Sequence, residues 1–370
     1  MVIIDKSNAT DPIEGQLFRI TFCFFLLAFL LTNYSWQEYL VLLAAGSIAF
    51  ISYRITGRDE VVRFVVFVAA CRGREMQKVL KVVFWVTLVG MGAIILLSVT
   101  GIYGVPYITA EYRPGVMETR YTLGMGHPNA LQCMLWALTT LWIYLWGEKK
   151  QIIGYLAALG LNIGLFFLTD SKTGILIIVP IIVYAWLILG EQDGMIAKIL
   201  GALGILGTMF SVALSVFCAV TAHYTYEYRW STDLSRKAEL ISKLDRILNG
   251  RIGMLVDNER WEGSIGTWLL WSEPANNYYF DMGWVRLFYW YGIIPATLCV
   301  IVLLLVMGYC LKKKEYAAIV MITSFAFYSI MEAHAISVYL ARNYVLFLVA
   351  AYWWQMVPGR TLQKKENNTF

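Results

Sequence analysis

The sequence carries little charge for its length. Asp, Glu, Lys and Arg together make up 15% of the 370 residues, whereas 59% of the residues are hydrophobic. A soluble globular domain averages about 25% charged and about 45–50% apolar residues. A chain of this size cannot hide such an apolar excess in a water-soluble core, so part of it must face lipid. The composition therefore indicates an integral membrane protein.

Several other features are missing. The first 15 residues lack the short basic-then-apolar layout of a cleaved signal, so the first apolar run is expected to be retained. None of the six cysteines lies in the long polar segment 221–281, which argues against a disulfide framework or a metal cluster. The net charge of +5 comes mostly from short connectors, so no nucleic-acid partner is expected. No repeat or linker divides the chain, and residues 1–370 are expected to form a single membrane domain.

What the sequence does contain is a series of long apolar runs. A helix needs about 20 residues to cross a bilayer, and about ten runs satisfy this. They cover residues 17–33, 37–53, 82–103, 129–146, 151–169, 172–190, 196–220, 282–308, 316–333 and 338–356. The run 61–70 is short and contains Arg63, so it is a further span, a re-entrant piece or an interfacial helix. The predicted fold is an all-α polytopic bundle of about 10–11 spans.

Basic connectors predict the orientation of this bundle, because short cytoplasmic loops are rich in Lys and Arg. If ten spans alternate, the basic connectors fall on one side, which should be the cytoplasm and should hold both termini. These connectors contain Arg54, Arg58, Arg72, Arg74, Lys78, Lys81, Lys149, Lys150, Lys312, Lys313, Lys314, Arg360, Lys364 and Lys365. Residues 104–128, 169–173 and the long loop 221–281 then lie outside.

The long outer loop has an internal helical pattern. Leu240, Leu244, Ile247, Leu248, Ile252 and Leu255 recur at helical spacing, and Ser231-Thr232-Asp233 offers cap candidates before them. The pattern predicts an amphipathic external helix that lies on the membrane or closes over a cavity. A structural lid without chemistry is the simpler alternative.

Three outward turns each open a predicted span. They are Gly126-His127-Pro128-Asn129, the segment from Asp170 to Gly174, and the segment from Asn276 to Asp281. The N-terminus of a helix presents unpaired N–H groups and a partial positive charge, which suits an anion. Ordinary capping of transmembrane helices, with Pro128 at the first helical position and Ser171 or Thr173 as a cap, is the alternative.

Ionisable side chains gather at the same outer ends. Arginine binds phosphate through two parallel hydrogen bonds and stays charged, so an outward cluster fits a lipid diphosphate, although it also fits contact with lipid headgroups. The arginines concerned are Arg120, Arg229, Arg246, Arg251, Arg286 and Arg342. Asp281, Glu332 and His334 lie at or inside the outer ends of the last spans, where ionisable groups are costly and usually functional. A buried Glu332–Arg342 pair that only locks helices is the alternative.

Taken in order, these segments resemble the O-antigen polymerase and ligase superfamily, and most closely its capsule or exopolysaccharide repeat-unit polymerases. The matching stretches are Gly124 to Asn129, Leu168 to Gly174, Leu244 to Ile252, Asp281 with Tyr291-Gly292, and Glu332 with Asn343. Each motif is short. Their order, and the large outer loop after the seventh span, carry the resemblance over residues 120–345.

The resemblance implies a glycosyltransferase of the bacterial cytoplasmic membrane. Such enzymes polymerise oligosaccharide units linked to undecaprenyl diphosphate outside that membrane, without a nucleotide sugar, a cofactor or a metal. Arg251 matches the family's diphosphate-binding loop arginine, and Asp281 stands eleven residues before Gly292, where ligases usually carry a histidine. The family's Ser-Arg-Thr-like turn is here Ser171-Lys172-Thr173, and lysine keeps the charge without the two-pronged geometry.

The expected chemistry assigns roles to particular residues. A departing diphosphate needs positive charge, and an attacking sugar hydroxyl needs a base. Arg251, with Asp281 or Glu332 as base, is the predicted catalytic set, and the choice between the two carboxylates stays open. The predicted substrate-binding residues are His127, Asn129, Ser171, Lys172, Arg120, Arg342 and Asn343.

Other functions fit the same composition. A flippase or transporter is the main alternative, although transporters often contain internal repeats, which this chain lacks. A ligase of the same superfamily and a distantly related peptidoglycan polymerase are further alternatives. Expected partners are the lipid-linked oligosaccharide, the growing polymer and membrane lipid, with a flippase and a chain-length regulator as candidate protein partners. The sugars, their linkage and the oligomeric state are not determined by the sequence.

Overall fold

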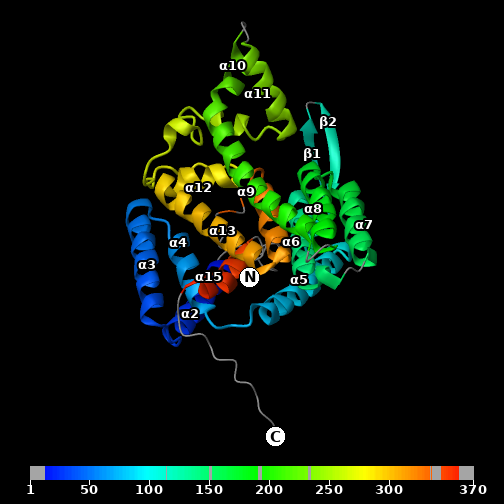
Figure 1. Cartoon of the computed structure of the whole chain (residues 1–370). Coiled ribbons are helices and arrows are strands. Elements are labelled where there is room, and N and C mark those ends of the chain that lie inside the picture. The colour runs from blue at the N-terminus through cyan, green and yellow to red at the C-terminus, as the bar shows by residue number, and fades with distance from the viewer. Residues whose placement is uncertain are drawn as a thin grey trace.

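The computed structural model describes residues 13–113, 115–149, 152–190, 194–231, 235–333, 335 and 343–357. In this part of the chain there are 14 α-helices, three short 3-10 helices and one β-hairpin. The predicted helical membrane fold is therefore confirmed in its main feature, and the hairpin is an addition that hydropathy did not predict. Figure 1 shows the bundle with α10, α11 and the hairpin projecting at one end.

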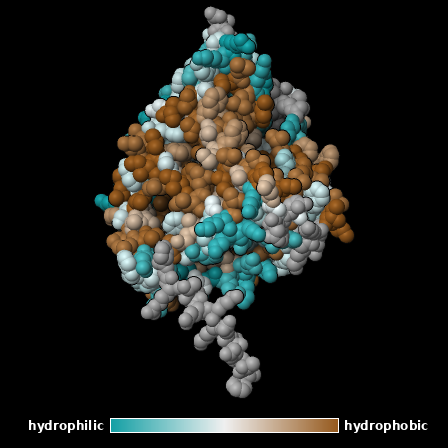
Figure 2. All heavy atoms as spheres, in the orientation of Figure 1, coloured by the Kyte–Doolittle hydropathy of each residue, from teal (hydrophilic) through white to brown (hydrophobic). Residues whose placement is uncertain are grey.

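Six helices are long and apolar enough to cross a membrane: α3 (Trp36–Thr56), α5 (Met76–Val99), α7 (Ile152–Thr169), α8 (Lys172–Gly190), α9 (Met195–Thr221) and α13 (Ile293–Lys313). Less than half of each span is buried inside the protein. Figure 2 shows hydrophobic side chains over the flank of the bundle and hydrophilic ones at the projecting tip. An apolar flank of this kind requires lipid around it, so the chain is a multi-pass membrane protein.

The remaining helices are shorter or less apolar. They are α2 (Ile13–Leu30), α4 (Glu60–Ala70), α6 (Pro128–Trp146), α10 (His223–Trp230), α11 (Arg236–Ile247), α12 (Gly283–Tyr291), α14 (Tyr316–Tyr328) and α15 (Val345–Met356). Single 3-10 turns cover Gly147–Lys149, Gly253–Val256 and Ile265–Thr267. The predicted runs 17–33, 129–146 and 316–333 correspond to α2, α6 and α14. The first part of the run 338–356 lies outside the described residues.

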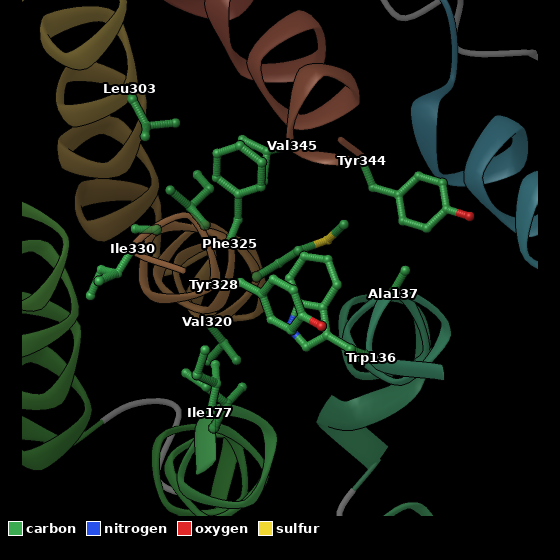
Figure 3. Packing of buried hydrophobic residues seen from close by; sticks show 14 of the residues in the cluster. Trp136, Ala137, Ile177, Leu303, Val320, Phe325, Tyr328, Ile330, Tyr344 and Val345 are labelled. Atoms are coloured by element: carbon green, nitrogen blue, oxygen red, sulfur yellow. The ribbon is translucent and has the colours of Figure 1, made fainter. Parts of the chain in front are cut away.

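Helix α14 forms the centre of the bundle. It packs against α6, α8, α9, α13 and α15, and nearly all its residues are buried. A helix that is apolar on every side belongs in such an interior. Tyr328 stacks on Trp136 of α6 with ring centroids 4.3 Å apart, and the Trp136 indole donates to the Ser324 hydroxyl (2.8 Å). Figure 3 shows these rings where α6 and α14 meet. The packing fixes the end of α14, which leads to Glu332.

The predicted span 282–308 is two helices rather than one. The chain breaks at Gly292 between α12 and α13. There the backbone N–H groups of Ile293 and Ile294 donate to the carbonyls of Leu269 and Leu270, at 2.9 and 3.1 Å. The loop before α12 therefore supplies the hydrogen bonds that a continuous helix would have made. As a result, the segment that contains Asp281 is tied to the bundle.

The short helix α4 returns the chain from one end of α3 to the other. Arg58, just after α3, donates to the backbone carbonyls of Asn276 (2.6 Å) and Trp290 (3.3 Å). Near the start of α3, Glu38 pairs with Arg72 beyond α4 (2.7 Å). The segment from Arg58 to Arg72 therefore runs the length of α3. The run 61–70 therefore belongs to a segment that runs from one face of the bundle to the other, although α4, with 11 residues, is not among the six candidate spans.

This crossing corrects part of the predicted topology. We call the side that carries Arg58, the hairpin, α10 and α11 the loop face. Arg74, Glu148 and Lys314 line hollows on the opposite face, as the basic connectors predict. Arg54 in the last turn of α3 and Arg58 beyond it, however, lie at the loop face and not with those connectors.

The extra crossing also separates the two ends of the described chain. Phe18 of α2 lies 4.2 Å from the Arg63 guanidinium near the start of α4, whereas the Trp354 indole of α15 bonds to Val68 near the end of α4 (2.7 Å). The first described turn therefore lies toward the loop face and the last toward the opposite face. The termini themselves, residues 1–12 and 358–370, lie outside the described residues, so their placement on one side stays a prediction.

The loop face carries two small structures. Helix α11 packs on α10, and its cap is Ser235, whose hydroxyl accepts from the Ala238 N–H (3.1 Å). Ser231 instead ends α10, and residues 232–234 lie outside the described residues. The predicted external helix is thus shorter than expected, and Leu240 and Ile247 are exposed. The hairpin joins β1 (Tyr107–Arg113) and β2 (Val116–Tyr121) in antiparallel register.

Candidate functional site

The three residues predicted as catalytic lie together at the loop face. The Arg251 guanidinium pairs with the Asp281 carboxylate through Nη1 and approaches Glu332 Oε1 through Nη2 at 3.4 Å. The three residues come from the outer loop, the segment before α12 and the segment after α14. Only the folded chain brings them into contact. The resulting cluster has one cation between two carboxylates.

Local structure around the α11 C-terminus directs Arg251 inward. Asn249 and Gly250 both have left-handed backbone, with φ of 55° and 79°, so the chain reverses directly after α11. Glycine suits such a turn because it has no Cβ to clash. The Asp245 carboxylate accepts the backbone N–H groups of Ile252 (2.7 Å) and Gly253 (3.1 Å), which fixes the residues on the far side of Arg251. Asp245 is therefore a positioning residue for the arginine.

Close packing of α12 against the end of α14 places the two carboxylates. A Cβ on Gly283 would lie 2.5 Å from the Glu332 carbonyl oxygen, so only glycine allows this approach. The Trp284 N–H donates to the Ser329 carbonyl (3.2 Å), and its indole donates to the Ala326 carbonyl (2.9 Å). Asp281, two residues before α12, is thereby held beside Glu332.

Arg251 is largely desolvated in this position, with 9% of its surface exposed. Its Nε atom is buried, and among the described residues it has no hydrogen-bond partner. A buried guanidinium with unused donor capacity is a strong anchor for an anionic oxygen, because the hydrogen bond is charge-assisted. The guanidinium therefore offers charged N–H donors to an anionic oxygen in a desolvated setting.

His127 caps α6 beside this cluster. Its Nδ1 accepts the Asn129 backbone N–H (3.2 Å), and Pro128 occupies the first turn of the helix, as predicted. Although part of the ring is exposed, desolvation lowers the pKa of His127. The Arg251 and Arg120 guanidinium groups lower this pKa further, and the Asp281 carboxylate opposes them. The neutral ring is therefore favoured, and its proton lies on Nε2 because Nδ1 accepts a hydrogen bond.

Arg120 connects the hairpin to the turn between α7 and α8. Its guanidinium contacts the carboxylates of Glu118 (2.7 Å) and Asp170 (2.9 Å). Asp170 has a left-handed backbone (φ 47°), which short polar residues tolerate. Arg120 also lies close enough to His127 to affect its pKa. Arg120 and His127, both predicted to bind substrate, therefore border the same site. A second pair of carboxylates, Glu118 and Asp170, contacts Arg120 beside the hairpin.

The other predicted binding residues are placed less closely. Lys172 is the exposed first residue of α8, Ser171 is buried before it, and Asn129 lies in the first turn of α6. Asn343 is buried just before α15. Their contact with substrate stays a prediction. Arg342 and His334 lie outside the described residues.

Three residues at the site had no predicted role, and Arg286, which was predicted to belong to the outward arginine cluster, packs on aromatic rings instead. Asp245 and Asp170 stood inside quoted motifs but had no assigned function, and Glu118 lies in the unforeseen hairpin. Arg286 of α12 is 3% exposed, and its guanidinium lies 3.7 Å from the Tyr279 ring centroid and 4.1 Å from that of Trp290. The only sequence signal for Asp245 was its position six residues before Arg251.

The chemistry of the site follows from its side chains. In the described part of the chain, no group of three His, Cys, Asp or Glu side chains could hold a metal ion. The cations at the site are guanidinium groups, and two carboxylates stand beside them. The site can bind an anion and accept a proton, which are two requirements of transfer from a diphosphate donor.

Comparison with other proteins adds no assignment. No family model, curated protein or solved structure matches this chain.

Proposed function

We propose that this protein is a membrane glycosyltransferase that joins lipid-diphosphate-linked oligosaccharide units into a polymer on the non-cytoplasmic side of the membrane. The observation that carries the proposal is the contact of Arg251 with both Asp281 and Glu332. The order of the sequence motifs, which resembles that of repeat-unit polymerases, supports it. The loop face would then lie outside the cytoplasm.

The reaction makes one bond and breaks one. The acceptor hydroxyl oxygen attacks the anomeric carbon of the donor sugar, and the bond from that carbon to the diphosphate oxygen breaks. The lipid diphosphate leaves with the electron pair, stabilised by Arg251. The hydroxyl proton passes to a carboxylate. Positioned positive charge is most effective where negative charge develops, and a desolvated guanidinium meets that requirement.

Contact lengths suggest which carboxylate is the base. Glu332 has the longer contact with Arg251, at 3.4 Å, whereas the contact of Asp281 is tighter. A diphosphate that binds Arg251 would therefore displace Glu332 first. The Glu332 carboxylate would then accept the hydroxyl proton, while Asp281 would keep the guanidinium in place. We assign the base to Glu332 and the positioning role to Asp281.

The experiment uses purified protein in lipid nanodiscs with a synthetic lipid-diphosphate oligosaccharide, and products are separated on a gel. Wild type should give a ladder. Arg251→Ala should abolish the ladder, and Arg251→Lys, which keeps the charge, should fold normally and retain only a trace. Arg246→Ala is the matched control, because Arg246 is an exposed arginine in the last turn of α11.

The outcomes separate the alternatives. A ladder of normal length from the Arg251 variants would contradict the proposal. A single transfer to a different acceptor would indicate a ligase, and lipid movement without transfer would indicate a transporter. Glu332→Gln should lower kcat with little change in KM, whereas Asp281→Asn should raise KM as well. The opposite pattern would exchange the two roles.

A further inference from the structure

The β-hairpin Tyr107–Tyr121 has two faces of different character. Side chains alternate across a strand, so residues 107, 109 and 111 share one face with residues 117, 119 and 121. On this outer face Tyr107 pairs with Tyr121, Thr109 with Thr119, and Glu111 with Met117. All six side chains are exposed. The other face carries Ile108, Ala110, Glu118 and Arg120, which are partly buried.

The inner face anchors the hairpin to the site. Arg120 binds Asp170 in the turn before α8, and its charge reaches His127. The outer face therefore starts beside the site that contains Arg251, Asp281 and Glu332, and it extends away from that site. Figure 1 shows the hairpin beside α11, projecting from the ends of α7 and α8, and β2 contacts α7 at its base. A long molecule leaving the site could lie along this face.

The outer face has an unusual mixture of groups for this chain. The Tyr107 and Tyr121 rings are 52% and 41% exposed, and their centroids are 6.2 Å apart at 69°. Beside them the Thr109 and Thr119 hydroxyls are hydrogen-bonded to each other at 2.9 Å. By contrast, the outward residues of α7, such as Ile153, Leu156 and Phe167, are wholly apolar. The hairpin face is thus too polar for a surface that contacts lipid tails.

This mixture matches the surface of a carbohydrate. A pyranose ring presents a C–H face that packs on an aromatic ring, and hydroxyl groups at its edge that bond to polar side chains. A strand pair of this length is too small for a stable protein interface, which buries about 800 Å² on each partner. We propose that the outer face of the hairpin binds the glycan chain as it leaves the site. This inference rests on the proposed polymerase function and adds a holding surface for its product.

Such a surface should affect chain length more than bond formation. A polymer that stays bound near the site is extended again, because its end remains at high local concentration. The reacting groups lie on the other side of Arg120, so the first transfer should not need the hairpin tyrosines. Loss of both rings should therefore shorten the product and leave the rate of a single transfer unchanged.

The experiment compares wild type with Tyr107→Ala/Tyr121→Ala and Tyr107→Phe/Tyr121→Phe in nanodiscs. The binding probe is the free oligosaccharide, released by mild acid from lipid-linked units that accumulate in cells lacking this chain. The alanine variant should bind the probe roughly tenfold more weakly, since two stacking contacts are lost. It should also give shorter polymers at an unchanged first-transfer rate. The phenylalanine variant should behave like wild type in binding and length.

The controls keep this inference separate from the polymerase proposal. Unchanged probe binding and unchanged length in the alanine variant would overturn the hairpin assignment, even if wild type polymerises normally. Absence of any transfer by wild type would overturn the polymerase function, and probe binding would still test the hairpin. A variant that loses thermal stability only in lipid, with normal probe binding, would show that the tyrosines contact the bilayer, which also overturns the inference.

Discussion

The two faces of the bundle both carry carboxylates but stabilise them differently. On the loop face, Asp281 and Glu332 share the Arg251 guanidinium. On the opposite face, Glu315 accepts a hydrogen bond from the Tyr352 hydroxyl (3.0 Å), which lies 3.4 Å from the Tyr144 hydroxyl. Glu315 and Tyr144 border a hollow of about 330 Å³ that Glu148 also lines. The loop face therefore holds a desolvated cation, and the opposite face holds a chain of phenols.

The difference shows why only one face is suited to the proposed reaction. A guanidinium paired with carboxylates can release one of them to an anionic ligand and keep its charge balanced. On the opposite face a neutral phenol donates to the carboxylate, and the cations that line the hollows there, Arg74 and Lys314, are exposed to solvent rather than desolvated like Arg251. A carboxylate alone is therefore a poor signal of function in this chain. The signal is a carboxylate in contact with a desolvated arginine, such as Arg251. The predictions that follow test this contrast.

The largest expected effect is the difference in coupling between the two faces. A double-mutant cycle of Arg251→Gln with Asp281→Asn should give a coupling energy of about 2–3 kcal/mol, since the pair is ionic and mostly buried. A cycle of Tyr352→Phe with Glu315→Gln should give about 1 kcal/mol, because the donor is neutral. Thermal unfolding in detergent measures both. Equal coupling energies in the two cycles would contradict the proposed difference between the two faces.

The second prediction concerns Gly283, which allows α12 to approach Glu332. Gly283→Ala should destabilise the protein by about 1–3 kcal/mol, because the added methyl group overlaps the Glu332 carbonyl. It should also reduce transfer activity by moving Asp281. Gly92→Ala in α5 and Gly308→Ala in α13 are matched controls, since a Cβ there meets nothing within 4 Å. Similar losses in the controls would attribute the effect to helix position rather than to the contact.

The third prediction uses the lowered pKa of His127. Because the folded protein favours the neutral ring, the stability contributed at this position is present above the ordinary value of 6.5 and is lost as the pH falls below it. His127→Asn keeps a good helix cap and removes the titration. Stability and activity of the variant should therefore fall less than those of wild type between about pH 7 and pH 5. If stability and activity depended on pH in the same way in the variant and in wild type, His127 would be excluded as the titrating group.

The smallest expected effect lies on the opposite face. Burial raises the pKa of Glu148, and the Glu315 carboxylate raises it further. The stability from its protonated form is complete below the ordinary value of 4.5 and is lost as the pH rises through the folded pKa. Glu148→Gln should remove this loss and stabilise the protein slightly at neutral pH, with no change in transfer. A drop in activity would connect this face to the reaction.

Hydropathy predicted most of the transmembrane helices closely. Span 172–190 agrees with α8 at both ends, and 196–220 agrees with α9 within one residue. The signal is strong there because lipid requires long apolar segments with all backbone hydrogen bonds internal. It failed at α4, whose 11 residues are too few for a recognisable span. That single helix reversed the placement of Arg58.

The hairpin and the external helices were harder to predict. Tyr107–Tyr121 lacks a strong apolar alternation, and its inner face is held beside the turn at Asp170 by Arg120. The cap of α11 is Ser235 rather than the earlier polar residues, and the hydrophobic positions 240 and 247 turned out to be exposed. Spacing identified a helix in this loop, but it could not show which side would be covered.

The site was only partly determined by the sequence. The sequence by itself specified a multi-pass bundle and placed Arg251, Asp281 and Glu332 among the ionisable groups near the outer ends, where charge next to lipid is costly and needs a reason. Only the tertiary structure decided that these three make contact, since glycine at 283 lets α12 meet the end of α14 and Asp245 turns Arg251 inward. Contacts between segments far apart in sequence depend on packing, and local patterns do not contain that information.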